Sequence, residues 1–418
     1  MNYPSNNLEF YHQFSNLSRL KDFCLENGLL EKKSVCPSCK STDNKIVIYR
    51  GNIYYRCCLN KCQRRWSARN NIFSFNKKSN LSFFKILEIF WYWSSAATIK
   101  DTASNCKLQK KIVISWFDKI RNYCHSHQLD ASPMGGKGYN IQIDESLFRG
   151  KRKSNRGRLL LGDKKPKENV LDKLRSIVEN NQSSRNYGNR VTGPWVFGMV
   201  LQDKKVLKLN KDIRKFNDKI TKKITKGKES NVDKRKLNTK ENRIYNSIKK
   251  HKFKNSLMKE AQLVTKEVRM FYVPKRDARN LLPLIVSNCK TKSEVVSDEW
   301  RAYKRIKNYD FKHFTVNHSK NFVDPKTKRH TQLIECLWNV AKAKIIKRAR
   351  GLKESKISGY LAEEWFRSIH IEKNGSVIFE SIINLIKLNS YETILENIHI
   401  KKLEFQKYKN EFDLEFKY

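Results

Sequence analysis

Apolar residues recur along the chain at two spacings, and the change from one to the other predicts where helices give way to strands. Helical spacing predicts a short helical lead-in over residues 1–30, helices over residues 80–128 and a helical tail over residues 371–418. Between residues 138 and 370, strand-like and helix-like patterns alternate. Such alternation indicates an α/β domain that follows a helical region.

Several elements are predicted inside residues 138–370. The strands are Tyr139–Asp144, Trp195–Leu201, Val268–Val273, Glu294–Ser297 and Phe311–Val316, and the helices are Arg276–Cys289 and Gln332–Lys342. Trp195–Leu201 is apolar throughout, as expected of a central strand covered on both faces. The first three strands predict an antiparallel meander, which can begin an RNase H-like fold.

Two polar, Lys-rich insertions interrupt this region, near residues 159–187 and 203–262. Both are expected to be loops or solvated helices. They either add contacts to a polyanion or are lineage-specific additions without a function of their own.

Charge narrows the choice of partner. The 418 residues include 87 Lys and Arg but 41 Asp and Glu, a formal net charge of +46. Nucleic acid is the usual partner of so basic a chain, because phosphate contacts release counterions. An AT-rich genome also inflates Lys, Asn and Ile, so composition has a second explanation. No apolar stretch approaches about 18 residues and no signal core precedes the first helix, so we expect an intracellular protein without a membrane partner.

Residues 31–75 contain a cysteine cluster. Cys36 and Cys39 form one close-spaced pair, and Cys57 and Cys62 form a second after a hairpin-length segment. Two such pairs are typical of a zinc ribbon, in which four thiolates hold one structural Zn²⁺. Cys58 competes with Cys57 for the third ligand position, and spacing alone leaves both open.

Residues 80–128 predict a helix-turn-helix, in which a short helix over Thr98–Ala103 is followed by a second over Lys110–Tyr123. Helix pairs of this kind place the second helix in the DNA major groove. The positions expected to be exposed and to face DNA are Gln109, Lys110, Lys111, Ser115 and Arg121. The alternative is a subdomain that only packs.

Three carboxylates stand near the ends of predicted elements. Asp144 ends the first strand, Asp298 follows the fourth, and Glu335 lies in the first turns of the helix Gln332–Lys342. Three acids gathered at one point can hold two divalent cations, which catalyse phosphodiester chemistry. The basic run Lys151, Arg152 and Lys153 follows Asp144 and is expected to hold DNA beside it.

Several motifs occur in the order of a known family. They are Ile143-Asp144-Glu145-Ser146, Gly193-Pro194-Trp195-Val196-Phe197-Gly198, Ser297-Asp298-Glu299-Trp300-Arg301-Ala302-Tyr303, Val316-Asn317-His318-Ser319 and His330-Thr331-Gln332-Leu333-Ile334-Glu335-Cys336-Leu337-Trp338. Over residues 30–370 the chain resembles transposases of the Merlin superfamily and their bacterial ISXO-like relatives. The two insertions depart from the family pattern, as does Gln332, where Asn is frequent.

The resemblance implies a fold and an activity. The fold is α/β, with an RNase H-like catalytic domain (a mixed sheet with flanking helices) preceded by a zinc ribbon and a helix-turn-helix. Asp144, Asp298 and Glu335 would be a DDE triad that binds two Mg²⁺ or Mn²⁺ ions, cleaves double-stranded DNA at terminal inverted repeats and joins the 3′ end to target DNA.

The resemblance also implies a homo-oligomer, located in the nucleus if the host is eukaryotic. Two rivals remain from the residues alone. One is a domesticated DNA-binding protein without catalysis. The other is an RNase H-like nuclease that cuts without joining.

Overall fold

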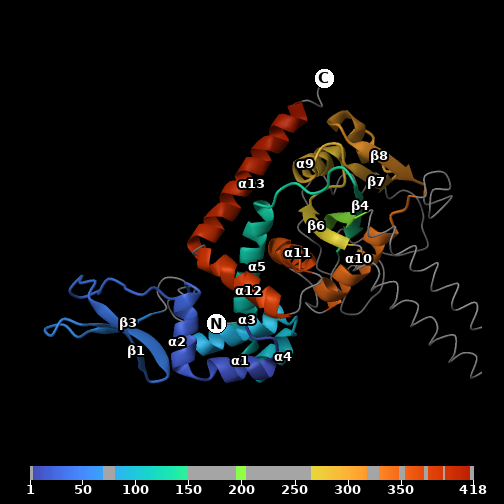
Figure 1. The fold of residues 1–418 in the computed structure, drawn as a ribbon. Coiled ribbons are helices and arrows are strands. Elements are labelled where there is room, and N and C mark those ends of the chain that lie inside the picture. Colours follow the sequence, from blue (N-terminus) through green and yellow to red (C-terminus); the bar gives the residue numbers. More distant parts are fainter. Residues whose placement is uncertain are drawn as a thin grey trace, which may run out of the picture.

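The protein is described by a computed structural model, which covers residues 3–68, 81–148, 194–203, 265–317, 329–347, 354–370, 375–388 and 391–414. The predicted insertions near 159–187 and 203–262 lie outside these residues, apart from Asp203, which ends a strand. Figure 1 shows a small N-terminal sheet, a group of helices and a larger sheet flanked by helices. No helix in the described residues has the length and apolar character needed to cross a membrane.

The larger sheet has five strands in the order β6-β5-β4-β7-β8. Their bounds are β4 Tyr139–Leu147, β5 Trp195–Asp203, β6 Thr265–Val273, β7 Glu294–Asp298 and β8 Lys312–Val316. The first three strands pair antiparallel, while β7 is parallel to both β4 and β8. This order and these directions define the RNase H-like fold, so the predicted fold class is confirmed.

Alternation along the strands gives the sheet two apolar faces. One face packs Ile141, Ile143 and Phe197 against α9 (Ala278–Asn288). The opposite face packs Val196 and Val200 against α10 (Gln332–Lys342) and α11 (Glu354–Ser368). Because both faces are covered, polar side chains on the sheet are excluded from water unless they reach a strand end.

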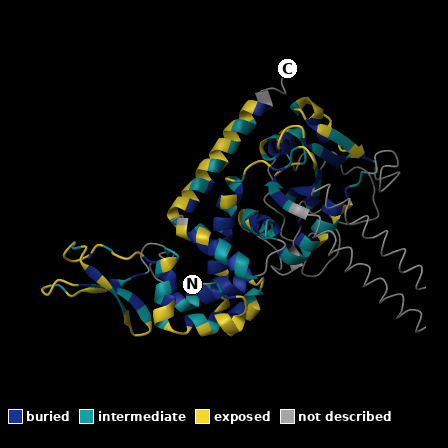
Figure 2. Cartoon of the chain, viewed as in Figure 1, coloured by how far each residue is buried: buried dark blue, intermediate teal, exposed yellow. Residues whose placement is uncertain are grey.

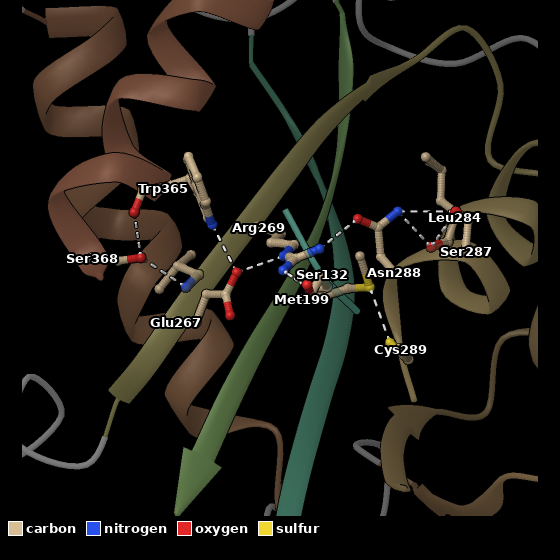
Figure 3. Close-up of polar contacts among 11 residues, drawn as sticks. Ser132, Met199, Glu267, Arg269, Leu284, Ser287, Asn288, Cys289, Trp365 and Ser368 are labelled. Carbon is tan, nitrogen blue, oxygen red and sulfur yellow. Dashed lines mark hydrogen bonds and ion pairs between the residues drawn. The ribbon is translucent and has the colours of Figure 1, made fainter. Parts of the chain in front are cut away.

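Arg269 is a charged exception inside this sheet, with 2% of its surface exposed. Figure 3 shows its guanidinium between three acceptors. It donates to Glu267 Oε1 at 2.6 Å, to Asn288 Oδ1 at 3.0 Å and to the Ser132 carbonyl oxygen at 2.5 Å. A buried cation is tolerated when its donors are paired in this way, and here it ties β6 to the end of α9.

The N-terminal sheet has the order β1-β2-β3, with bounds Asn44–Tyr49, Asn52–Cys57 and Arg65–Ser67. The sheet projects from a group of helices (Figure 1). Their bounds are α1 Asn7–Phe14, α2 Leu17–Glu26, α3 Phe83–Ser94, α4 Ile99–Asn105 and α5 Lys110–Leu129. Helix starts follow ordinary capping chemistry, since their N-cap side chains accept backbone N–H bonds. These caps include Asn6, Asn16, Ser82 and Thr98.

The predicted helical tail consists of two helices, α12 (Gly375–Leu388) and α13 (Tyr391–Leu414). α12 packs on α3 and α5, and α13 runs along α5 to reach α9 (Figure 1). Asn397 donates to Ser126 Oγ and Asp130 Oδ2 of the α5 segment, each at 2.8 Å, and Lys409 donates to Asn280 at 2.6 Å. The C-terminal helices therefore join the helical region to the large sheet, while the outward side of α13 stays largely exposed (Figure 2).

Candidate active site and metal centres

The sheet brings Asp144 and Asp298 together. Parallel pairing of β4 with β7 aligns Gln142 with Val296, and the same register carried two residues further sets Asp144 level with Asp298. Asp298 ends β7, whereas β4 continues beyond Asp144 to Leu147, so the strand end predicted at Asp144 lies three residues further on. The equal parity of the two residues directs both side chains to one face of the sheet. Two carboxylates far apart in sequence thus become neighbours.

Glu335 reaches the same place from α10. It lies in the first turn of the helix, exposed, and its Oε1 accepts a bond from Thr331 Oγ1 at 3.2 Å. The pKa of Asp144 is raised to about 6 by burial first, and then by the charges of Asp298 and Glu335. All three acids are therefore close enough to interact electrostatically around Asp144.

Gln142 fixes the start of α10 and was missed as a functional position in the sequence. Its fully buried side chain lies two residues before Asp144 on the same strand face. Oε1 of Gln142 accepts the backbone N–H groups of Leu333 at 3.1 Å and Ile334 at 3.2 Å. The N-cap residue Thr331 makes no capping bond, so this strand residue supplies the acceptor that the helix start requires.

Trp338 makes a second tie between α10 and β4. Its Nε1 donates to Asp144 Oδ2 at 2.9 Å. Gly198, which pairs with Asp144 across the sheet, leaves room for the indole, since a Cβ there would lie 2.5 Å from Trp338 Cη2. Gln142 and Trp338 thus hold the helix on either side of Glu335.

Gly198→Ala should destabilise the protein by about 1–3 kcal/mol, because the added methyl group overpacks the space filled by Trp338. Urea unfolding measures the change. In a Trp338→Ala background the same Gly198→Ala substitution should cost much less, because the opposing ring is gone. An equal cost in both backgrounds would contradict the close packing described for this pair.

The opposite face of the strand carries a fourth acid, Glu145. Its pKa is raised to about 7, mainly by burial, and it accepts a hydrogen bond from the Tyr303 hydroxyl. Asp298 is held at its own strand end, where Oδ1 accepts the backbone N–H of Trp300 at 3.0 Å. Glu145 thus faces away from α10 and is engaged by Tyr303, although the charges of Asp144 and Asp298 also raise its pKa.

The acidic cluster of Asp144, Asp298 and Glu335 has the donor chemistry of a magnesium site, since carboxylate oxygens are the ligands that Mg²⁺ prefers. The Trp338 indole N–H donates to one oxygen of Asp144, and the Trp300 backbone N–H donates to one oxygen of Asp298. These two hydrogen bonds orient the two carboxylates. In the described part of the chain, however, these acids do not form a group at metal-ligand spacing. Shared ions would require the three carboxylates to approach one another.

Four cysteines, by contrast, lie at metal-ligand spacing. The sulfur atoms of Cys36, Cys39, Cys57 and Cys62 all lie within 4.8 Å of one another. Cys36 Sγ is 3.7 Å from Cys62 Sγ, and Cys39 Sγ is 3.6 Å from Cys57 Sγ. A tetrahedral ion with Zn–S bonds of about 2.3 Å requires sulfur–sulfur distances of about 3.8 Å. The four thiols therefore fit one zinc ion, and their three-stranded sheet is that of a zinc ribbon.

The positions of the Cys57 and Cys58 side chains show which of the two thiols belongs to the four-cysteine cluster. Cys57 ends β2 buried and faces the other sulfurs, whereas Cys58 is exposed and its sulfur lies 4.0 Å from the Arg56 carbonyl oxygen. Cys57 thus belongs to the cluster and Cys58 does not.

The short helix α4 and the longer α5 are joined by a tight turn with Lys107 in the left-handed region (φ 53°). Two helices are thus present where they were expected, and their assignment as a helix-turn-helix stays a prediction. Gln109, Lys110 and Lys111 are exposed at the start of α5, and Ser115 is partly exposed. Their role toward DNA stays a prediction. The other predicted contacts, Lys151, Arg152 and Lys153, lie outside the described residues.

The expectation that Arg121 is exposed is wrong. Arg121 is 6% exposed and lies between α5 and α11. Nε donates to Glu363 Oε2 at 2.8 Å and Nη1 to Asp118 Oδ1 at 3.0 Å, and the guanidinium lies over the Tyr360 ring. Helical periodicity alone does not reveal that a second helix covers this side of α5.

Arg121→Met should destabilise the protein by about 3 kcal/mol, because it leaves the buried Glu363 with Arg367 as its one remaining ion pair among the described residues. The matched control, Lys110→Met on the exposed side of the same helix, should stay within about 0.5 kcal/mol. Urea unfolding compares the two variants. Wild-type stability of Arg121→Met would contradict the structural role.

Two comparisons with known proteins show similarity to transposases. Residues 225–368 match the family described as the ISXO2-like transposase domain. An uncharacterized transposase-like protein of Haemophilus influenzae is 31% identical over 108 residues, which cover 25% of this chain and 85% of that protein. A pre-cleavage Mos1 transpososome structure aligns over 75% of this chain and 77% of that chain, with 10% identity and a TM-score of 0.19. So low a score carries no weight for the fold, which rests on the strand order.

Proposed function

The chain belongs to the ISXO2-like transposase family, and we propose that it is a DDE transposase that cleaves DNA at transposon ends and transfers the 3′ end to target DNA. The observation that carries the proposal is the acidic cluster. Asp144 and Asp298 lie level on the adjacent parallel strands β4 and β7, on the face covered by the helix that bears Glu335.

Within this proposal the three acids have different roles. Asp144, Asp298 and Glu335 would together hold two Mg²⁺ or Mn²⁺ ions, with Asp144 shared by both ions and Asp298 and Glu335 each holding mainly one. Such ions activate water or a 3′-hydroxyl and stabilise the leaving oxygen. The chain's own contribution is geometric, because Trp338 orients the Asp144 carboxylate and Gln142 fixes the helix that carries Glu335.

DNA binding is assigned to two sets of basic and polar groups. The exposed start of α5, with Gln109, Lys110, Lys111 and Ser115, would contact DNA, and Lys151, Arg152 and Lys153 would hold it beside Asp144. One Zn²⁺ on the four cysteines would stabilise the ribbon. As in the family that the motifs resemble, we expect the protein to act as a homo-oligomer.

A single assay separates this function from its rivals. The full-length protein is incubated with Mg²⁺ and labelled duplexes that carry the sequences flanking its gene, together with a target plasmid. The proposal predicts a cut strand followed by a joined product, both lost with a chelator. Cutting without joining would indicate a nuclease, and binding without cutting would indicate a DNA-binding protein that no longer catalyses.

A further inference from the structure

The zinc ribbon has two chemically different faces. Strand register assigns Tyr55 and Trp66 to one face, where both are buried and their rings stack with centroids 5.6 Å apart. The other face carries the side chains of alternate residues, which are Lys45, Val47, Tyr49, Tyr54, Arg56, Arg65 and Ser67. We call this second set the outer face. It belongs to a sheet that projects from the helical region (Figure 1).

Three cations lie abreast on the outer face. Lys45 pairs with Arg56 across β1 and β2, and Arg56 pairs with Arg65 across β2 and β3. Strands lie about 4.8 Å apart, so the row spans about 10 Å. Directly opposed like charges destabilise a sheet, which means that this row costs stability in the free protein.

The row has no acidic counterpart among the described residues. No ion pair joins Lys45, Arg56 or Arg65 to a carboxylate there, and the hydrogen-bond partner of the Arg56 guanidinium is the neutral Gln63, at 2.9 Å. Lysines scattered over a solvated surface need neither alignment across neighbouring strands nor packing against an aromatic ring. This row has both, because the Arg65 guanidinium stacks over the Tyr49 ring at 3.8 Å.

Aromatic groups complete the surface. Tyr49 is 37% exposed and contacts the Tyr54 ring edge-on, with centroids 6.2 Å apart. Arg50 adds a further cation within 5.3 Å of the Tyr49 ring. Stacked guanidinium groups and tyrosine hydroxyls are typical donors to phosphate oxygens.

We propose that the outer face of the zinc ribbon binds the sugar–phosphate backbone of duplex DNA, as a site separate from the helix-turn-helix and from the acidic cluster. Duplex DNA carries one charge per about 1.7 Å of its axis, so several phosphates fall within the width of the row. This inference rests on the proposed function in one respect, which is that DNA is the substrate. It contributes affinity without reading sequence, because it contacts the backbone.

The test compares two triple variants of equal charge in the full-length protein. One is Lys45→Gln/Arg56→Gln/Arg65→Gln. The control is Lys137→Gln/Lys290→Gln/Lys407→Gln, which changes three exposed lysines remote from the ribbon. Fluorescence anisotropy with a 30-bp duplex gives the affinity between 50 and 300 mM NaCl, and zinc content is measured for both.

The plot of log association constant against log NaCl concentration should become less steep by about 2.7 in the ribbon variant. Each lost phosphate contact contributes about 0.9 to the slope, and three cations are removed. The control should change the slope by much less. Equal changes in the two variants would overturn the proposal, as would a change seen with double-stranded RNA but not with DNA.

A second probe does not depend on removing charge. Photo-crosslinking from p-benzoylphenylalanine at position 47 on the outer face should capture DNA, whereas the same group in place of the exposed Leu59 on the second knuckle should capture far less. Absence of a crosslink from position 47 would reject the site even if the triple variant lost zinc. Both measurements are repeated with Asp144→Asn, so that a failure of the catalytic proposal leaves the binding result readable.

Discussion

Asp298→Asn should reduce Mg²⁺-dependent DNA cleavage at least about 1000-fold, which corresponds to about 4 kcal/mol in the activation barrier. The amide keeps the shape of the side chain and the bond to the Trp300 N–H, but it removes the negative charge that would hold a cation. Single-turnover cleavage of a labelled duplex measures the effect.

The neighbouring acid is the control. Glu299→Gln removes an equal charge one residue away, but this side chain is exposed and accepts a bond from Asn317. It should leave cleavage within a few-fold of wild type. If both substitutions reduced cleavage alike, general loss of negative charge would explain the result and the assignment of Asp298 would fail.

Cys57→Ser should remove zinc and unfold the ribbon, because the metal supplies folding free energy that so small a sheet lacks, with apparent values of about 10–16 kcal/mol for structural sites. Trp66 is buried in this sheet, so its fluorescence should shift to that of an exposed indole. Zinc content and limited proteolysis of residues 31–68 provide independent measurements.

Cys58→Ser changes the adjacent, exposed thiol and is the matched control. It should keep one zinc ion per chain and a wild-type Trp66 spectrum. Loss of zinc in Cys58→Ser, with retention in Cys57→Ser, would show that the ligand set is wrong.

Much of the catalytic domain was predictable because its pattern is simple. Five strands and two helices were expected within a few residues of their observed bounds, and acids at strand ends were expected to converge. Sequence order indicates which strands carry Asp144 and Asp298. The parallel register that makes them neighbours required the structure.

The supporting contacts were not predictable from the pattern. Gln142 looks like any polar strand residue until α10 is placed with its first N–H groups over it. Gly198 looks like a weak point in an apolar strand until Trp338 fills the space above it. Arg121 was assigned to the wrong environment for the same reason, because α11, far away in sequence, covers it.

The central claim is that Asp144, Asp298 and Glu335 form one metal site. The most direct test is a crystal of the protein with duplex DNA and Mn²⁺, measured at a wavelength where manganese scatters anomalously. We predict anomalous peaks between the three carboxylates, with Asp144 closest to all of them. Manganese bound elsewhere, with these three carboxylates still apart, would contradict the claim.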